Sequence, residues 1–254
     1  MLDKAASEAL LGGFPCDLWL PDYPLGACGD WAIKRIMMVA ARGYWGEVYR
    51  IHGTVLLEGP GRAGKASWMS LTPSEIESQT IGLDAARGHT VVLGLGMGWL
   101  AANVALKSEV SHVTVVERND DVLGLFEQLG VFDQLPLEAR EKIEIVKADA
   151  LEYRPTAPVD SMQADIWERF TEVQKLADVR RMQDNIGAKA VYFWGQEMEI
   201  WRAALLRFGQ QPALNWDRLR SIVAEDISLP LILPEWPDYP AKITAAAPWW
   251  YKPD

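Results

Sequence analysis

Cysteine, basic charge and long apolar runs are all scarce in this sequence of 254 residues. The two cysteines, Cys16 and Cys28, have neither the close spacing nor the neighbouring histidine that a metal site needs, so we expect no metal and no obligatory disulfide. Acidic residues outnumber basic ones and give a net charge of −10. This charge disfavours nucleic acid as a partner, because affinity for it comes mainly from Lys and Arg that neutralise phosphates.

The chain also lacks the signals of a membrane or secreted protein. Its most apolar window, residues 91–106, is too short and too rich in glycine to span a bilayer, and the first residues do not form a signal peptide. We therefore expect a cytoplasmic protein with no membrane partner. A composition of 49% hydrophobic and 24% charged residues is enough for one large core with a small extension, and it leaves a homo-oligomer open.

The most informative stretch of the sequence predicts a short apolar strand, a glycine-rich turn, a helix and a second strand, in that order. The turn contains Gly94, Gly96 and Gly98, where the absence of side chains would let a ligand lie on the backbone. The following helix would direct its free N–H groups at that ligand. The second strand, residues 113–116, leads to Glu117, from which a carboxylate can accept hydrogen bonds from ribose hydroxyls. This order predicts a nucleotide-binding α/β fold.

The spacing of the glycines distinguishes between cofactors. A dinucleotide fingerprint requires GxGxxG, but Trp99 stands at the third position, where an indole would hold the helix away from the sheet. NAD is therefore disfavoured. The observed GxGxG, together with Glu117, resembles motif I of the class I S-adenosylmethionine-dependent methyltransferases and the related spermidine-synthase-like proteins. The resemblance implies that the glycines approach the methionyl and ribosyl parts of S-adenosylmethionine and that the acid binds its ribose. A third strand leading to Asp149 and Ala150 matches the element that meets the adenine, so both residues are expected to bind the cofactor.

Two further acids are candidates for catalysis. A fourth strand over residues 159–164 would place Asp165 and Glu168 at the carboxyl edge of the sheet, where ligands of open α/β sheets bind. In spermidine synthases an acid at the matching position takes a proton from the attacking amine. For Asp165 three roles are open: it acts as a general base, it orients a nucleophile, or it caps the following helix. The resemblance implies methyl transfer to a small-molecule acceptor. Residues 59–79 lack a recognisable polyamine-binding pattern, so aminopropyl transfer is the alternative rather than the leading function. A non-catalytic nucleoside-binding protein is a second alternative.

The sequence as a whole predicts a Rossmann-like, mostly parallel sheet sandwiched by helices. Residues 1–69 would form a loop-rich and β-hairpin extension, and residues 70–254 the cofactor-binding domain. The extension would begin with a short helix and contain a hairpin of residues 46–51 and 54–58, with a tight turn at residues 52–53. A helix capped by Thr72, with Glu75 completing a capping box, would run to about residue 86.

Toward the C-terminus we expect a helix over residues 168–184, a fifth strand at 190–194 and a helix at 196–208. Residues 227–233 are the single candidate for a further antiparallel strand, and the tail rich in Pro and Trp is not expected to continue regular structure. Residues 59–65 match GxxxxGK but lack the following Ser or Thr of a P-loop, so they are interpreted as a glycine-rich hairpin end or a substrate-side loop. Of twelve tryptophans, Trp167 is the candidate for a substrate pocket.

Overall fold

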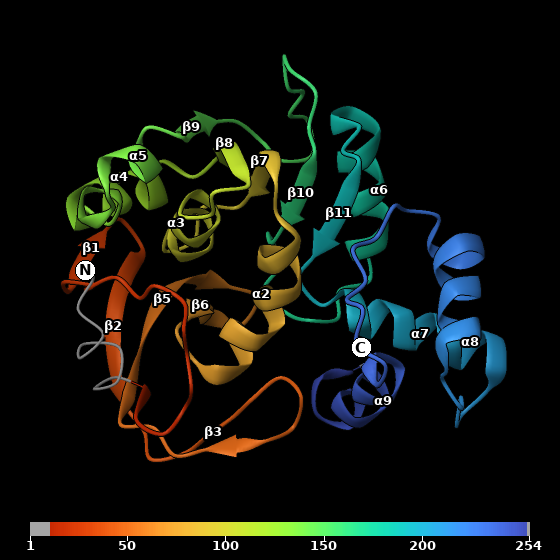
Figure 1. Cartoon of the computed structure of the whole chain (residues 1–254). Coiled ribbons are helices and arrows are strands. Elements are labelled where there is room, and N and C mark those ends of the chain that lie inside the picture. Colours follow the sequence, from red (N-terminus) through yellow and green to blue (C-terminus); the bar gives the residue numbers. More distant parts are fainter. Residues whose placement is uncertain (1–10, 253–254) are drawn as a thin grey trace.

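The computed structural model describes residues 11–252, which form a parallel sheet covered by helices next to a smaller antiparallel sheet (Figure 1). The short N-terminal helix that the sequence predicts lies outside the described residues. Among the residues described, no helix combines the length and the apolar character that crossing a membrane requires.

The parallel sheet confirms the predicted fold class. Its strands are β7 (Gly88–Leu93), β8 (Val110–Glu117), β9 (Ile143–Lys147), β10 (Ser161–Ala164) and β11 (Ala190–Phe193), in the order β11-β10-β7-β8-β9. All four neighbouring pairs are parallel. The chain first moves outward from β7 to β9 and then crosses back to place β10 on the other side of β7. The carboxyl ends of β7 and β10 therefore flank the point where the strand order reverses, which is where open α/β sheets bind ligands.

Helices cover both faces of this sheet. Val92 of β7 and Val115 of β8 pack in one core cluster with helices α3 (Trp99–Ala105) and α4 (Asp120–Leu129). Val91 and Val191 point to the opposite face, in a second cluster with α6 (Lys175–Ile186) and α7 (Gln196–Phe208). Successive residues of one strand thus pack against different helices, which explains the near-continuous apolar character of these strands. The shorter helices are α5 (Leu137–Arg140), α8 (Trp216–Ser221), a 3₁₀ turn η1 (Phe132–Gln134) and a π-helical turn η2 (Ile222–Ile227).

The antiparallel sheet corrects the predicted hairpin. It consists of β1 (Gly26–Cys28), β2 (Trp31–Met37), β5 (Gly53–Gly61) and β6 (Gly64–Ser70), in the order β1-β2-β5-β6. The predicted partners do not pair with each other: β4 (Val48–Tyr49) pairs with β3 (Ala41–Arg42), whereas β5 lies between β2 and β6. The tight hairpin is instead β5–β6. The glycine-rich segment that resembled a P-loop, residues 59–65, covers the end of β5, the turn and the start of β6, which confirms the interpretation as a hairpin end.

Helix α2 (Pro73–Ala85) begins and ends close to the predicted limits, and Thr72 caps it by accepting a hydrogen bond from the Glu75 N–H. The reciprocal half of the predicted capping box is wrong. The Glu75 side chain is buried near Asp165, and its Oε1 atom has no hydrogen-bond partner. Tertiary packing directs the Glu75 carboxylate away from the N-terminus of α2, and this packing outweighs the attraction between the two.

Three expectations for the C-terminal part need correction. Helix α6 starts at Lys175, seven residues later than predicted, so Asp165 does not cap it. The expected antiparallel strand at residues 227–233 is reduced to one parallel bridge between Val191 and Leu231. The tail does form a helix, α9 (Tyr239–Trp250). Pro240 is tolerated because it lies in the first turn, where no intrahelical N–H bond is needed, and Pro248 lies close to the helix end.

Candidate functional site

A cavity of about 310 Å³ lies between the carboxyl edge of the parallel sheet and the antiparallel sheet. Residues that follow β7, β8, β9 and β10 line one side, and residues of β2, β5 and β6 line the other. Its size falls in the range of small-molecule pockets, and it lies at the reversal of strand order. Of the predicted cofactor-binding residues, the cavity lining contains Gly94, Gly96, Glu117, Asp149 and Ala150.

The glycines of the turn have different roles. Gly94, Gly96 and Gly98 have φ values of 99°, 52° and 76°, a region that favours glycine. A Cβ atom on Gly94 would lie 2.2 Å from the backbone oxygen of Asp165, so this glycine lets the strand ends approach each other. Gly98 does not line the cavity; a Cβ there would lie 2.3 Å from the Phe126 ring. Gly98 therefore permits packing between α3 and α4.

Glu117 stands at the end of β8 with its carboxylate directed at the glycine turn. One oxygen, Oε2, accepts from the Leu95 N–H at 3.1 Å. The other, Oε1, accepts from the N–H groups of Arg118 at 2.9 Å and Asn119 at 2.8 Å. A carboxylate offers about four acceptor positions, so capacity for a ligand hydroxyl remains. The side chain thus joins the β7–α3 turn to the β8–α4 turn and borders the cavity.

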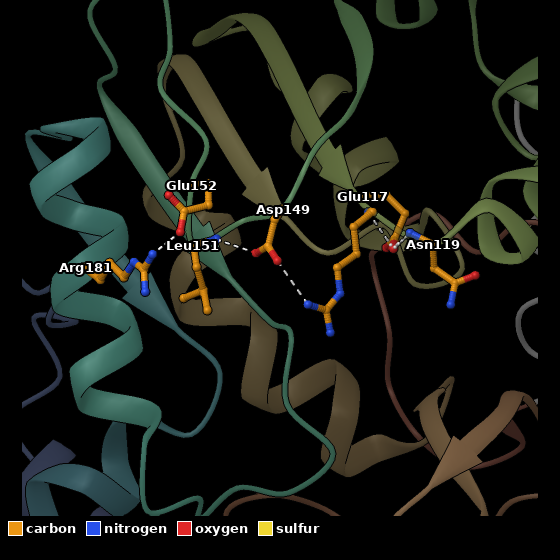
Figure 2. A network of polar contacts seen from close by, with 7 residues as sticks. Glu117, Asn119, Asp149, Leu151, Glu152 and Arg181 are labelled. Carbon is orange, nitrogen blue, oxygen red and sulfur yellow. Dashed lines mark hydrogen bonds and ion pairs between the residues drawn. The ribbon is translucent and has the colours of Figure 1, made fainter.

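Asp149 lies two residues beyond β9, beside Glu117 at the same sheet edge (Figure 2). Its Oδ1 atom accepts from the Leu151 N–H at 2.9 Å, which orients the carboxylate in its own turn. Its Oδ2 atom accepts from Arg118 Nη1 at 3.1 Å, and the Arg118 side chain is 72% exposed. Ala150 adds a small apolar surface to the cavity. The strand ends therefore bring together both acids that the sequence predicted for the cofactor.

Asp165 directly follows β10, and its half-buried side chain opens onto the cavity. Gln79 of α2, which also lines the cavity, donates a hydrogen bond from Nε2 to Asp165 Oδ2 at 2.7 Å. Burial raises the pKa of Asp165 to about 7, although the nearby Lys175 and the bond from Gln79 favour the ionised form. A carboxyl group with such a pKa can hold or release a proton near neutral pH.

Two charged groups behind Asp165 were not predicted from the sequence. Burial, followed by the negative charge of Asp165, raises the pKa of Glu75 well above its usual range. Lys175 is fully buried, and its Nζ donates to the carbonyl oxygens of Arg169 at 2.8 Å and Trp194 at 2.9 Å. Burial lowers the pKa of Lys175 to about 7, opposed mainly by Asp165. Together with Asp165 these groups form a buried acid–base cluster, of which only Asp165 lines the cavity.

Glu168 does not line the cavity. Its Oε2 atom accepts from the backbone N–H of Arg62 at 3.2 Å, in the turn between β5 and β6. The Arg62 side chain forms an ion pair with Glu172, a buried carboxylate on the same loop as Glu168. These contacts fasten the hairpin end to the loop after β10. The structure thus places Asp165 at the cavity and Glu168 outside its lining.

Trp167 lines the cavity, as the sequence predicted, and its indole N–H donates to Asp178 at 3.0 Å. Trp99 behaves differently from its predicted role. Its indole is fully buried and donates to the carbonyl oxygen of Trp19 at 2.9 Å, so it is directed at the N-terminal segment and α3 still packs on β7 and β8. The expectation that this indole would hold the helix off the sheet is wrong. No group of three potential metal ligands occurs within residues 11–252.

The comparisons with known proteins give partial structural likenesses. No protein-family model matches the chain, and no curated protein matches it. The chain is similar to the glycopeptide N-methyltransferase MtfA complexed with sinefungin, with 15% identity and a TM-score of 0.34 over 43% of this chain and 44% of that chain. It is also similar to DhpI in its SAH complex, with 14% identity and a TM-score of 0.32 over 44% and 52% of the two chains. For the methyltransferase domain of bacterial CtHen1-C the identity is 18% and the TM-score 0.33, over 44% and 59%. The matched region thus spans roughly half the length of these chains.

Proposed function

We propose that this chain is an S-adenosylmethionine-dependent methyltransferase that acts on a small molecule. One observation carries the proposal: the glycine turn after β7, Glu117 at the end of β8 and Asp149 after β9 line one cavity at the reversal of strand order. The sequence resemblance assigns cofactor contacts to these same positions. An ordinary turn between a strand and a helix needs neither three glycines with positive φ nor two acids that line the same cavity, so their combination supports the proposal.

The chemistry of the lining fits this cofactor. Its titratable groups are the carboxyls of Glu117, Asp149 and Asp165 and the single guanidinium of Arg118, which already pairs with Asp149. Carboxylates suit the ribose hydroxyls and the adenine amino group, which are donors, and they favour the positive sulfonium and ammonium groups. NAD and ATP instead carry phosphates, and an excess of carboxyls disfavours them. Glu117 would hold the ribose, Asp149 and Ala150 the adenine, and Gly94 and Gly96 the methionyl part.

When bound, S-adenosylmethionine supplies a methyl group: its sulfur–methyl bond breaks as the acceptor's new bond to carbon forms, and S-adenosylhomocysteine is left. The chain's own residues orient the acceptor and handle its proton. We assign the acceptance of that proton to Asp165, because its carboxyl lines the cavity and accepts a hydrogen bond from Gln79. After the transfer the proton leaves Asp165 to solvent. Asp165 is therefore the proposed catalytic base, while Glu168 contributes by holding the hairpin end.

We propose a small-molecule acceptor because the cavity is of small-molecule size and the net charge of −10 disfavours a phosphate backbone. The oligomeric state and a cytoplasmic location stay predictions of the sequence. Aminopropyl transfer would use the same site with a decarboxylated donor. A nucleoside-binding protein would use the cofactor half alone.

The first test is calorimetric titration of the purified chain with S-adenosylhomocysteine, S-adenosylmethionine, NAD and ATP. The proposal expects saturable micromolar binding of the first two alone. Binding of NAD or ATP alone, or of none of the four, would contradict it. Formation of S-adenosylhomocysteine in the presence of an acceptor would separate an enzyme from a binding protein, and turnover of the decarboxylated donor alone would favour aminopropyl transfer. An Asp165→Asn variant should bind S-adenosylhomocysteine normally but lose turnover.

A further inference from the structure

The side of the cavity that faces the sheet edge has a distinct chemistry. It is formed by the antiparallel sheet, and we call it the roof: Trp31 of β2, Leu57 and Pro60 of β5, and Trp68 and Met69 of β6. None of these roof residues carries a charged group. The polar lining comes from the strand ends of the parallel sheet and from Gln79 of α2. The cavity therefore has one wall that carries all of its charged side chains and one wall that is uncharged and aromatic.

The two indoles of the roof are held in fixed positions. Trp31 lies against the backbone of Gly59, where a Cβ atom would be 2.4 Å from the indole ring, so only glycine allows this contact. Trp68 is anchored by a hydrogen bond of 2.8 Å from its indole N–H to the Pro60 carbonyl oxygen. The two ring centroids are 5.5 Å apart, with an interplanar angle of 48°. Because its N–H donor is bound within the hairpin, Trp68 offers a bound molecule ring surface rather than a hydrogen bond.

We infer that the roof binds the acceptor, and that the acceptor is a flat aromatic molecule with one N–H or O–H nucleophile directed at Asp165. The inference rests on the proposed function and adds the substrate class. The cofactor's polar groups require the carboxyls of the opposite wall, which leaves the uncharged roof to the second ligand. Indoles bind aromatic rings through stacked or edge-to-face contacts in addition to apolar burial.

A linear diamine fits this roof less well. Its first ammonium could pair with Asp165, but its second would find no carboxylate on the roof and could make only cation–π contacts with the indoles. Two acids on the loop after β10, Glu168 and Glu172, are engaged by the backbone and side chain of Arg62 at the hairpin end. An aromatic molecule with one nucleophilic group has no second charge to satisfy.

The test compares ligands that differ in aromaticity but little in size. The protein saturated with S-adenosylhomocysteine is titrated calorimetrically with 2-naphthol, with decahydro-2-naphthol and with 1,4-diaminobutane. The saturated bicycle buries a similar apolar surface, so a preference for 2-naphthol reports the ring contacts together with the stronger hydrogen bond of its phenolic O–H, and the Trp68 variants separate the two. We expect 2-naphthol to bind about tenfold more tightly than either alternative, since two ring contacts of about 0.5–1.5 kcal/mol each act together.

Variants locate the preference on the roof. Trp68→Leu should reduce the preference for 2-naphthol to less than about threefold, and Trp68→Phe should restore most of it. Trp249→Leu, at a tryptophan of α9 that does not line the cavity and is 47% exposed, is the matched control and should behave like the parent protein.

Equal binding of 2-naphthol and its saturated counterpart, or tighter binding of the diamine, would overturn the inference while leaving the proposed function intact. A Trp68→Leu variant that loses affinity for S-adenosylhomocysteine as strongly as for 2-naphthol would assign the roof to the cofactor and would also overturn it. Absence of S-adenosylhomocysteine binding to the parent protein would instead overturn the proposed function.

Discussion

Replacing Glu117 by alanine should weaken both the cofactor site and the fold. The sequence alone predicts loss of ribose binding with the fold retained. The structure adds that the carboxylate accepts hydrogen bonds from the N–H groups of Leu95, Arg118 and Asn119. These contacts hold together two turns at the sheet edge, so their loss affects the unliganded protein as well.

The magnitude follows from these three contacts. Each hydrogen bond to a charged group contributes about 1.5–3 kcal/mol, but water can reach part of this half-buried side chain's site and replace some of the loss. We therefore expect Glu117→Ala to lower the free energy of unfolding by about 2–4 kcal/mol. For a domain of this size, the corresponding fall in Tm is about 5–12 °C. The affinity for S-adenosylhomocysteine should fall about 10- to 150-fold, because the charge-assisted bonds to the ribose are lost.

Thermal denaturation without ligand and calorimetric titration with S-adenosylhomocysteine measure the two effects separately. Glu127→Ala, at an exposed position on α4, is the matched control and should change neither quantity. An unchanged Tm for Glu117→Ala would refute the reasoning about the turns. An unchanged affinity would remove Glu117 from the cofactor site.

Three further predictions concern the acid at the cavity and the glycine turn. Gln79→Leu removes the hydrogen bond to Asp165, so the acidic limb of the kcat/KM–pH profile should move to higher pH by about one unit, measured as methyl transfer at subsaturating acceptor. Because the pKa of Asp165 is raised to about 7 in the folded state, between pH 4 and 7 the native protein holds a proton that the unfolded chain has released. The free energy of unfolding, measured by urea denaturation, should therefore fall as pH rises through this window, and Asp165→Asn should reduce the fall. Gly98→Ala should destabilise the protein about 1–3 kcal/mol more than Gly187→Ala, since both glycines have positive φ but only the first would place a Cβ against the Phe126 ring.

The outcomes that contradict these predictions are specific to each. A profile of the Gln79 variant that keeps the parent's acidic limb would show that the hydrogen bond does not set the ionisation of Asp165. A pH dependence of stability that is the same in Asp165→Asn would assign the proton to another group. Equal destabilisation by the two glycine substitutions would show that the Phe126 ring yields without cost.

The sequence was most informative where the residue types and the spacing of the apolar residues predict the same element. Residues 91–93 and 113–116 are apolar except for Thr114 and rich in β-branched side chains, and both segments lie in strands of the parallel sheet. The turn at Gly94 and the helix capped by Thr72 also follow from local rules. The α9 helix was missed because proline was given its average effect rather than its effect in a first turn, as for Pro240.

The sequence by itself determined the individual strands of the parallel sheet, the order of the glycine turn and the acids, and the positions of Glu117 at the end of β8 and Asp149 just beyond β9, because each depends on neighbouring residues. Only the tertiary structure decided what faces these groups. Gln79 reaches Asp165 across 86 positions of sequence, and the roof indoles come from an antiparallel sheet whose pairing was predicted incorrectly. Strand partners and the direction of a buried side chain such as Glu75 are set by contacts between distant segments. No local pattern encodes them, because many pairings satisfy the same alternation of apolar and polar residues.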